Sequence, residues 1–177
     1  MQKDRTRQVQ IPEADAMGSR AFFPAGAGTL RSSAGSEPQP DGRPCRVLVV
    51  DDSALVRQGV AGLLGVQSDM EVVGQAETGR DAVALADALE PDVVTMDVNL
   101  PDVDGIEVTR RILAASPGIR VIGFSMHTGR KIVEAMREAG AVAYLQKLEG
   151  PRNLIETVRY WGVQVLSSEA SPGQRAV

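Results

Sequence analysis

The sequence has few of the residues on which several common classes of protein depend. Its 177 residues include one cysteine and one histidine. A single cysteine excludes an internal disulfide framework and a structural zinc site with two or more thiolates. The single histidine, His127, excludes a multi-histidine metal centre and disfavours a Ser-His-Asp triad. The reducing cytoplasm is therefore the compartment that we expect.

Long apolar runs and an excess of positive charge are lacking as well. No apolar run approaches the roughly 18 residues that a membrane-spanning helix needs, so we expect no membrane contact. Lys and Arg total 19 against 23 Asp and Glu, which gives a formal net charge of −4. A surface that coats nucleic acid needs a clustered basic excess, so this balance argues against such a role. With 43% apolar and 24% charged residues, the composition is typical of a soluble globular protein.

The first 44 residues differ in composition from the rest of the chain. They contain five glycines, five prolines and four serines, with charges of both signs and no sustained apolar period. Such a segment cannot bury enough apolar surface to offset the entropy lost on ordering. We expect residues 1–44 to be a disordered tail, residues 45–166 to form one domain, and residues 167–177 to be a short flexible tail.

From Cys45 onward, short apolar segments alternate with segments of helical periodicity. The expected strands are residues 45–50, 70–76, 92–97, 119–125 and 141–145. The expected helices start after Ser53, which can cap the first, and then cover 79–89, 106–115, 130–139 and a segment from Pro151. Five strands that alternate with five helices predict an α/β fold, in which helices cover both faces of a parallel sheet.

Polar side chains follow four of the expected strands. Asp51 and Asp52 follow the first strand, Asp97 ends the third, Ser125 ends the fourth, and Lys147 lies just past the fifth. Functional groups of open parallel sheets gather at the carboxyl ends of the strands. If the first and third strands are neighbours, three carboxylates crowd together and raise one another's pKa. A lysine and a divalent cation remove that conflict, and Mg²⁺ suits oxygen ligands better than Ca²⁺ where waters are retained.

Each of these polar groups also has an ordinary structural interpretation. The acidic pair at Asp51 and Asp52 is compatible with a solvated loop that caps a helix. Ser125 alone is compatible with a turn hydroxyl, and Lys147 alone with a surface charge. The joint placement of five polar groups from four strand ends at one edge of the sheet favours a functional site over separate structural roles.

Four motifs occur in order along the chain, and they are Val49–Ser53, Met96–Gly105, Ser125–His127 and Tyr144–Lys147. Together they resemble the receiver domain of two-component response regulators. The resemblance covers roughly residues 45–166. It implies a (βα)5 doubly wound fold with five parallel strands in the flavodoxin-like order 2-1-3-4-5.

The resemblance also implies a phosphoacceptor site. Asp97 would take a phosphoryl group from a phosphohistidine on a sensor histidine kinase or a phosphotransfer protein. Mg²⁺ would be held by Asp51, Asp52, Asp97 and the backbone carbonyl of Asn99, with Asp51 acting largely through water. Such a domain phosphorylates and dephosphorylates itself with Mg²⁺, and it is not a turnover enzyme.

Further roles follow from the same resemblance. Lys147 would neutralise a phosphoryl oxygen, and Ser125 would donate its hydroxyl to the phosphoryl group. Tyr144 occupies the aromatic switch position and would move inward with Ser125, although a half-buried core tyrosine is the alternative. Asn99 and His127 would influence the lifetime of the acyl phosphate, and an exposed loop residue is the alternative for His127.

The residues that follow Lys147 bear on what the domain controls. Leu148 follows Lys147 where most receivers have proline, and residues 147–154 resemble the subgroup that usually carries a helix-turn-helix domain. Only 11 residues follow Leu166, so we expect control of a protein effector, with homodimerisation through residues 129–166, in place of direct DNA binding. A phosphate shuttle or sink, a fragment of a transcriptional regulator, and a degenerate receiver that only docks are the alternatives.

Overall fold

The computed structural model of the chain describes residues 43–127 and 129–169, and for residues 163–169 it describes the helical backbone alone. Nearly all of the tail expected at residues 1–44 lies outside the described residues, as does most of the tail expected at 167–177. The expected disorder of both tails therefore stays a prediction.

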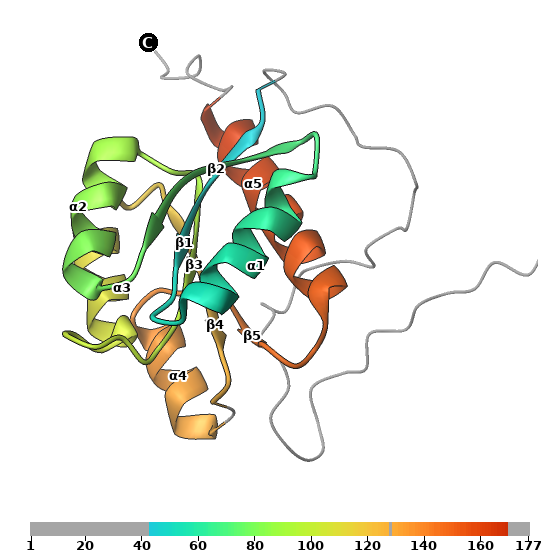
Figure 1. The fold of residues 1–177 in the computed structure, drawn as a ribbon. Coiled ribbons are helices and arrows are strands. Elements are labelled where there is room, and N and C mark those ends of the chain that lie inside the picture. The colour runs from blue at the N-terminus through green and yellow to red at the C-terminus, as the bar shows by residue number, and fades with distance from the viewer. Residues whose placement is uncertain (1–42, 128, 170–177) are drawn as a thin grey trace, which may run out of the picture.

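Five parallel strands form a single sheet within the described residues (Figure 1). They are β1 (Cys45–Val50), β2 (Met70–Ala76), β3 (Val93–Met96), β4 (Arg120–Ser125) and β5 (Ala143–Gln146). Their order is β2-β1-β3-β4-β5, and every neighbouring pair is parallel. The predicted sheet and its strand order are thus confirmed.

Helices cover both faces of this sheet (Figure 1). They are α1 (Ala54–Gly65), α2 (Gly79–Leu89), α3 (Gly105–Ala115), α4 (Arg130–Glu138) and α5 (Pro151–Glu169). Helices α1 and α5 pack on one face, where Val60 and Leu154 join the core. Helices α2, α3 and α4 pack on the other face, where Ile112 and Met136 are buried. The (βα)5 doubly wound architecture predicted from the sequence is confirmed.

Strand β1 shows why the sheet needs two apolar faces. Val47 and Val49 point toward α1 and α5, whereas Leu48 and Val50 point toward the opposite layer. Successive side chains of a strand alternate between faces, so a strand in the middle of a covered sheet needs apolar side chains on both faces. All four of these residues are at most 2% exposed.

The helix boundaries agree with the local sequence signals. Ser53 is the N-cap of α1, and its side chain accepts a hydrogen bond from the backbone N–H of Val56. Helix α4 ends one residue earlier than expected, with Ala139 as its C-cap. Gly140 follows with φ 101°, in the region that favours glycine. Within the described part of the chain, no helix combines the length and apolar character that crossing a bilayer requires.

The order of the strands makes the chain change direction across the sheet between β1 and β3. From β1 the chain moves outward to β2, and it then returns across β1 to β3. Connections that leave neighbouring strands in opposite directions open a crevice at the carboxyl ends of those strands. Here the neighbouring strands are β1 and β3, with Val50 paired to Met96.

Candidate functional site

Three carboxylates meet at the carboxyl ends of β1 and β3. Asp51 and Asp52 follow Val50, and Asp97 follows Met96, so the pairing of the two strands brings the three side chains together. One carboxylate oxygen from each lies within 4.8 Å of the other two. Asp51 and Asp97 are buried and Asp52 is exposed. The cluster predicted from the sequence is present in the fold.

Lys147 lies between two of these carboxylates. Its Nζ atom is 2.7 Å from Asp51 Oδ2 and 2.7 Å from Asp97 Oδ2. Its backbone N–H donates to the carbonyl of Ser125, which extends the pairing of β5 with β4 past the strand end. The lysine side chain is 9% exposed, so its charge is directed into the cluster.

The protonation behaviour of the cluster reflects burial and charge. Burial raises the pKa of Asp51 above its usual value, although the hydrogen bond from Lys147 opposes this effect. Burial by itself lowers the pKa of Lys147, but its bonds to Asp51 and Asp97 outweigh burial and raise that pKa. The lysine is therefore held in its charged form, as a partner for two buried carboxylates.

The donor set fits a hard divalent cation. Every side-chain ligand atom in the cluster is a carboxylate oxygen, and Asp52 presents its carboxylate from the exposed side. Mg²⁺ and Ca²⁺ take oxygen ligands, whereas zinc sites use cysteine and histidine as well. The geometry therefore supports the predicted acidic cation site, with Asp52 as the ligand most open to water.

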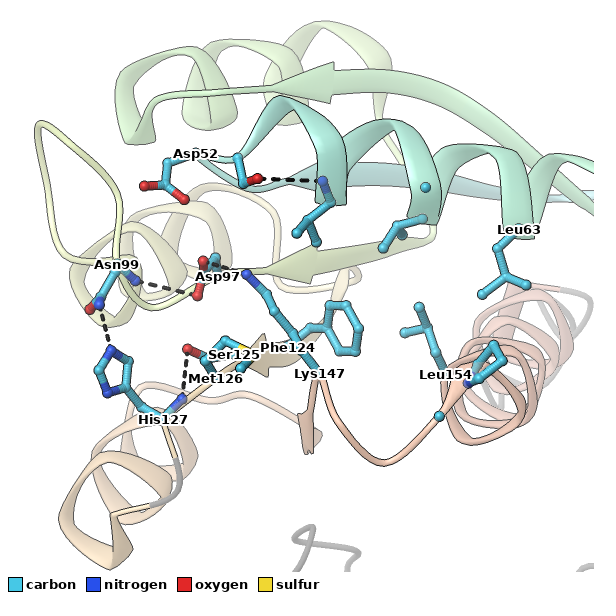
Figure 2. Close-up of a pocket in the computed structure, with 16 residues that line it drawn as sticks. Asp52, Leu63, Asp97, Asn99, Phe124, Ser125, Met126, His127, Lys147 and Leu154 are labelled. Atoms are coloured by element: carbon cyan, nitrogen blue, oxygen red, sulfur yellow. Dashed lines mark hydrogen bonds and ion pairs between the residues drawn. The ribbon is translucent and has the colours of Figure 1, made fainter.

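Ser125, Asn99 and His127 lie next to Asp97 on the side away from Asp52, and we call these three residues the rim of the site (Figure 2). Ser125 ends β4, is 1% exposed, and accepts a hydrogen bond from the backbone N–H of His127 at 3.4 Å. The side chain of Asn99 is 2.5 Å from His127 Nε2. The backbone N–H of Asn99 also lies 3.5 Å from Asp97 Oδ1. The loops after β3 and β4 are therefore joined across the mouth of the site.

Tyr144 is directed into the protein beside this rim. It is 2% exposed, and its hydroxyl donates to the backbone carbonyl of His127 at 2.7 Å. Burial raises its pKa above the usual value. The ring lies over Gly123, its partner across β4 and β5, where an added Cβ would be 2.5 Å from Tyr144 Cδ2. A glycine at this position makes room for the buried ring.

A cleft of about 610 Å³ extends from the acidic cluster between α1 and the start of α5. Figure 2 shows Asp52, Asp97 and Lys147 at one end of the cleft and Leu63 and Leu154 at the other. The site therefore has a charged end, where a cation can be held, and an apolar extension along α1.

Sequence reasoning identified the charged groups but missed three residues that support the elements around the site. Arg57 contacts the loop that bears Asp51, and Gly123 makes room for Tyr144. Asp102 accepts hydrogen bonds from the backbone N–H groups of Gly79 and Arg80, which ties the loop after β3 to the start of α2. No local signal marks an arginine within a helix or a glycine within a strand as part of a site.

Comparisons with known proteins agree with this geometry. Residues 47–159 match the family model described as the response regulator receiver domain. Response regulator GacA of Pseudomonas aeruginosa is 39% identical over 114 residues, which cover 64% of this chain and 53% of that protein. Transcriptional regulatory protein DegU of Brevibacillus brevis is 36% identical, with 64% of this chain and 48% of that protein covered. The chain thus spans about half the length of the curated relatives that it matches.

The structural comparison gives the same picture. The response regulator domain of Thermotoga maritima CheB is 36% identical in the aligned region, with a TM-score of 0.62. That alignment covers 71% of this chain and 98% of the other. The match therefore extends over essentially the whole of a solved domain of this type.

Proposed function

The chain belongs to the response regulator receiver domain family, and from this membership we propose that Asp97 is its phosphoacceptor. Receiver domains work in two-component signalling, and response regulators are signalling proteins, not turnover enzymes. The donor in this proposal is a phosphohistidine on a sensor histidine kinase or a phosphotransfer protein. The observation that carries the proposal is the meeting of three carboxylates with Lys147 at one edge of the sheet.

The transfer itself requires little covalent chemistry from the protein. A carboxylate oxygen of Asp97 forms a bond to phosphorus as the bond between phosphorus and the donor imidazole breaks, and the imidazole leaves with the electron pair. Catalysis of such a transfer is mainly positioning and neutralisation of charge. Lys147 already contacts Asp97 at 2.7 Å, so the same ammonium can pair with an oxygen of the incoming phosphoryl group.

Receiver domains bind Mg²⁺ at an acidic site, and the cluster here has the composition of one. In our proposal Asp52, Asp97 and the backbone carbonyl of Asn99 hold the ion directly. Asp51 contributes through water, since its carboxylate is already bonded to Lys147 and to the backbone N–H of Ser53. The bound ion would neutralise phosphoryl oxygens and fix their orientation.

Ser125 and Tyr144 are proposed as the switch. The Ser125 hydroxyl is buried at the end of β4, where it can donate to a phosphoryl group on Asp97. The Tyr144 hydroxyl is bonded to the carbonyl of His127, two residues beyond Ser125, so a shift of the loop after β4 changes what holds the tyrosine. Phosphorylation would in this way bias a two-state surface formed by α4, β5 and α5.

Asn99 and His127 are proposed as modulators of the phosphoryl lifetime. Both are exposed, and their side chains meet at 2.5 Å in front of Asp97. This pair borders one side of the site, so its side chains can affect the approach of a water molecule that hydrolyses the acyl phosphate. Replacement of His127 by alanine should therefore change the rate of dephosphorylation, and an unchanged rate would remove His127 from the proposal.

We propose that the receiver spans residues 45–166 and controls a protein partner through the face formed by α4, β5 and α5. The same face would carry any homodimer, and we expect no direct DNA or membrane contact and a cytoplasmic location. The second candidate is the receiver part of a transcriptional regulator. It is favoured by relatives of about twice the matched length, one of which is named a transcriptional regulatory protein. A phosphate shuttle or sink is distinguished from both by rapid phosphate loss without a downstream partner.

The phosphoacceptor proposal is tested by incubating the chain with acetyl phosphate and Mg²⁺, followed by intact-mass measurement. We expect one added phosphoryl group, lost in Asp97→Asn and in the presence of a chelator. Asp87→Asn, which changes an exposed carboxylate on α2, is the matched control and should be phosphorylated like the parent. A parent that takes no phosphate, or an Asp97→Asn variant that still does, would refute the proposal.

The proposed switch surface has a separate test. Hydrogen exchange is compared with and without beryllofluoride and Mg²⁺, a combination that mimics the phosphoryl group. We expect altered exchange in α4, β5 and the first part of α5. Exchange differences restricted to the loops around Asp97 would show that this face does not respond.

A further inference from the structure

Arg57, on the first turn of α1, is bonded to the loop that bears the acidic pair. Its guanidinium donates to the backbone carbonyl of Asp51 at 2.7 Å. A second guanidinium nitrogen lies 3.2 Å from a carboxylate oxygen of Glu77, just past the end of β2. The Arg57 side chain is 14% exposed, whereas Glu77 is 62% exposed. A mostly buried cation thus joins α1, the loop after β1 and the end of β2.

The sheet provides no hydrogen-bond donor for the backbone carbonyl of Asp51. The backbone N–H of Asp51 still donates to the carbonyl of Ala76, as in the ladder of β1 and β2. Asp51 Oδ1 accepts from the backbone N–H of Ser53. The carbonyl lies beyond Val50, the last residue of β1, and Arg57 supplies its hydrogen bond. A backbone carbonyl in a partly buried loop needs such a donor, and the donor fixes the plane of the peptide.

That peptide sets the direction in which the Asp52 side chain leaves the backbone. Among the described residues, no side chain or backbone group forms a hydrogen bond or ion pair with the Asp52 carboxylate. Lys147 holds the carboxylates of Asp51 and Asp97 directly, so Asp52 alone in the cluster depends on its backbone for orientation. The peptide between Asp51 and Asp52 is the one whose carbonyl Arg57 holds. A rotation of this peptide would move the Asp52 carboxylate relative to the other two.

We propose that Arg57 is a positioning residue for the cation site, which acts by holding the Asp51 carbonyl and thereby orienting Asp52. This inference rests on the cation site of the proposed function but not on phosphorylation of Asp97. Groups that orient metal ligands from behind typically change metal affinity by about 10- to 100-fold when they are lost. Arg57 itself touches neither the cation nor the phosphoryl group in this arrangement.

The roles of the two contacts of Arg57 can be distinguished by substitution. If the bond to the Asp51 carbonyl is the one that matters, loss of Glu77 should have little effect on cation binding, because the carbonyl bond remains. If Arg57 only fastens α1 to the sheet, its loss should lower stability without a change in cation affinity. Arg57→Lys keeps a donor for the carbonyl and should recover part of the affinity, although an ammonium cannot hold both partners in the same fork.

The test is a Mg²⁺ titration of the full chain, followed by the NMR shift of the Asp52 amide, with thermal unfolding measured in parallel. We expect Arg57→Met to raise the Kd for Mg²⁺ by about tenfold or more, and Arg57→Lys to lie between the parent and Arg57→Met. Glu77→Gln should stay within about twofold of the parent. Arg110→Met, which removes the exposed pair of Arg110 with Glu107 on α3, is the control for loss of an arginine.

A Kd for Arg57→Met within about twofold of the parent would overturn the proposal, whatever the change in melting temperature. If Arg57→Met does not fold, Arg57→Lys and Glu77→Gln decide the test. An unchanged Kd in Arg57→Lys with a rise of about tenfold in Glu77→Gln would overturn the proposal, whereas a raised Kd in Arg57→Lys with Glu77→Gln within about twofold of the parent supports it. Phosphorylation by acetyl phosphate is measured separately in the parent. A parent that binds Mg²⁺ but takes no phosphate would refute Asp97 as phosphoacceptor and leave the role of Arg57 to be decided by the Kd values.

Discussion

Replacement of Gly105 by alanine should displace the phosphoacceptor backbone. Gly105 is the first residue of α3, and its N–H donates to the carbonyl of Val98 at 2.8 Å. A Cβ on this residue would lie 2.0 Å from the backbone oxygen of Asp97 and 3.0 Å from its carbonyl carbon. Real Cβ contacts essentially never fall below 3.0 Å, so the backbone must move by about 1 Å. The obstacle is backbone, which cannot rotate away as a side chain could.

The size of the effect follows from two opposing terms. Overpacking against rigid neighbours costs about 3 kcal/mol, the upper end of the usual range. Alanine is favoured over glycine within a helix by about 0.5–1 kcal/mol, so the net loss in the free energy of unfolding is about 2 kcal/mol. A displacement of about 1 Å at the reacting carboxylate should lower the rate of phosphorylation by about 100-fold. Gly105 does not have positive φ, so backbone strain adds nothing to this sum.

The assay compares the rate of phosphorylation by acetyl phosphate with the free energy of unfolding in urea. Gly59→Ala is the matched control, because nothing lies within 4 Å of a Cβ at that position of α1. The control should be phosphorylated at the parental rate and should be slightly more stable. A Gly105→Ala variant that is phosphorylated at the parental rate would refute the argument, even if its stability falls, because Asp97 would not have moved.

Three further predictions concern pairs of residues that hold the fold together. Without Mg²⁺, Lys147→Met should lower the free energy of unfolding by about 3 kcal/mol at neutral pH, because two buried carboxylates lose their partner. Protonation of Asp51 relieves this conflict, so the free energy of unfolding should rise again as pH falls through the raised pKa of Asp51. Arg159→Met should cost about 1 kcal/mol at neutral pH, since Arg159 lowers the pKa of the partly exposed Asp69. That difference should vanish as pH falls through the lowered pKa, where protonated Asp69 no longer needs a cation. Gly123→Ala should cost about 1–3 kcal/mol in the parent and clearly less in a Tyr144→Ala background, where the approach of the added Cβ to Met136 Cε at 3.1 Å remains, as measured by urea unfolding.

Each of these has an outcome that contradicts it. A Lys147→Met variant whose stability falls on acidification would mean that its carboxylates are not in conflict. An Arg159→Met deficit that persists in acid would assign the loss to packing of the arginine stem. Additive effects of Gly123→Ala and Tyr144→Ala would mean that the ring does not occupy the space above the glycine.

The fold was predictable because its signals are local and repeated. The apolar run before Asp51 predicts a strand buried on both faces, and β1 has that character. Ser53 predicts a helix start, and it caps α1. Pro151 is the first residue of α5, as expected from a residue with fixed φ and no N–H. Boundaries shifted by one or two residues where the last turn or the strand end has no strong signal, as at Ala139.

The sequence by itself determined which chemistry this protein can carry. The site residues lie at or just past the ends of strands, and they are Asp51, Asp52, Asp97, Ser125 and Lys147. Parallel strands end at a common edge, so the meeting of these residues was implied by the alternation of strands and helices. Only the tertiary structure decided how they are held there. Contacts such as those of Arg57 with the Asp51 carbonyl and of Tyr144 with Gly123 depend on side-chain directions and strand register. These are set by packing between elements far apart in the chain, and no local pattern records them.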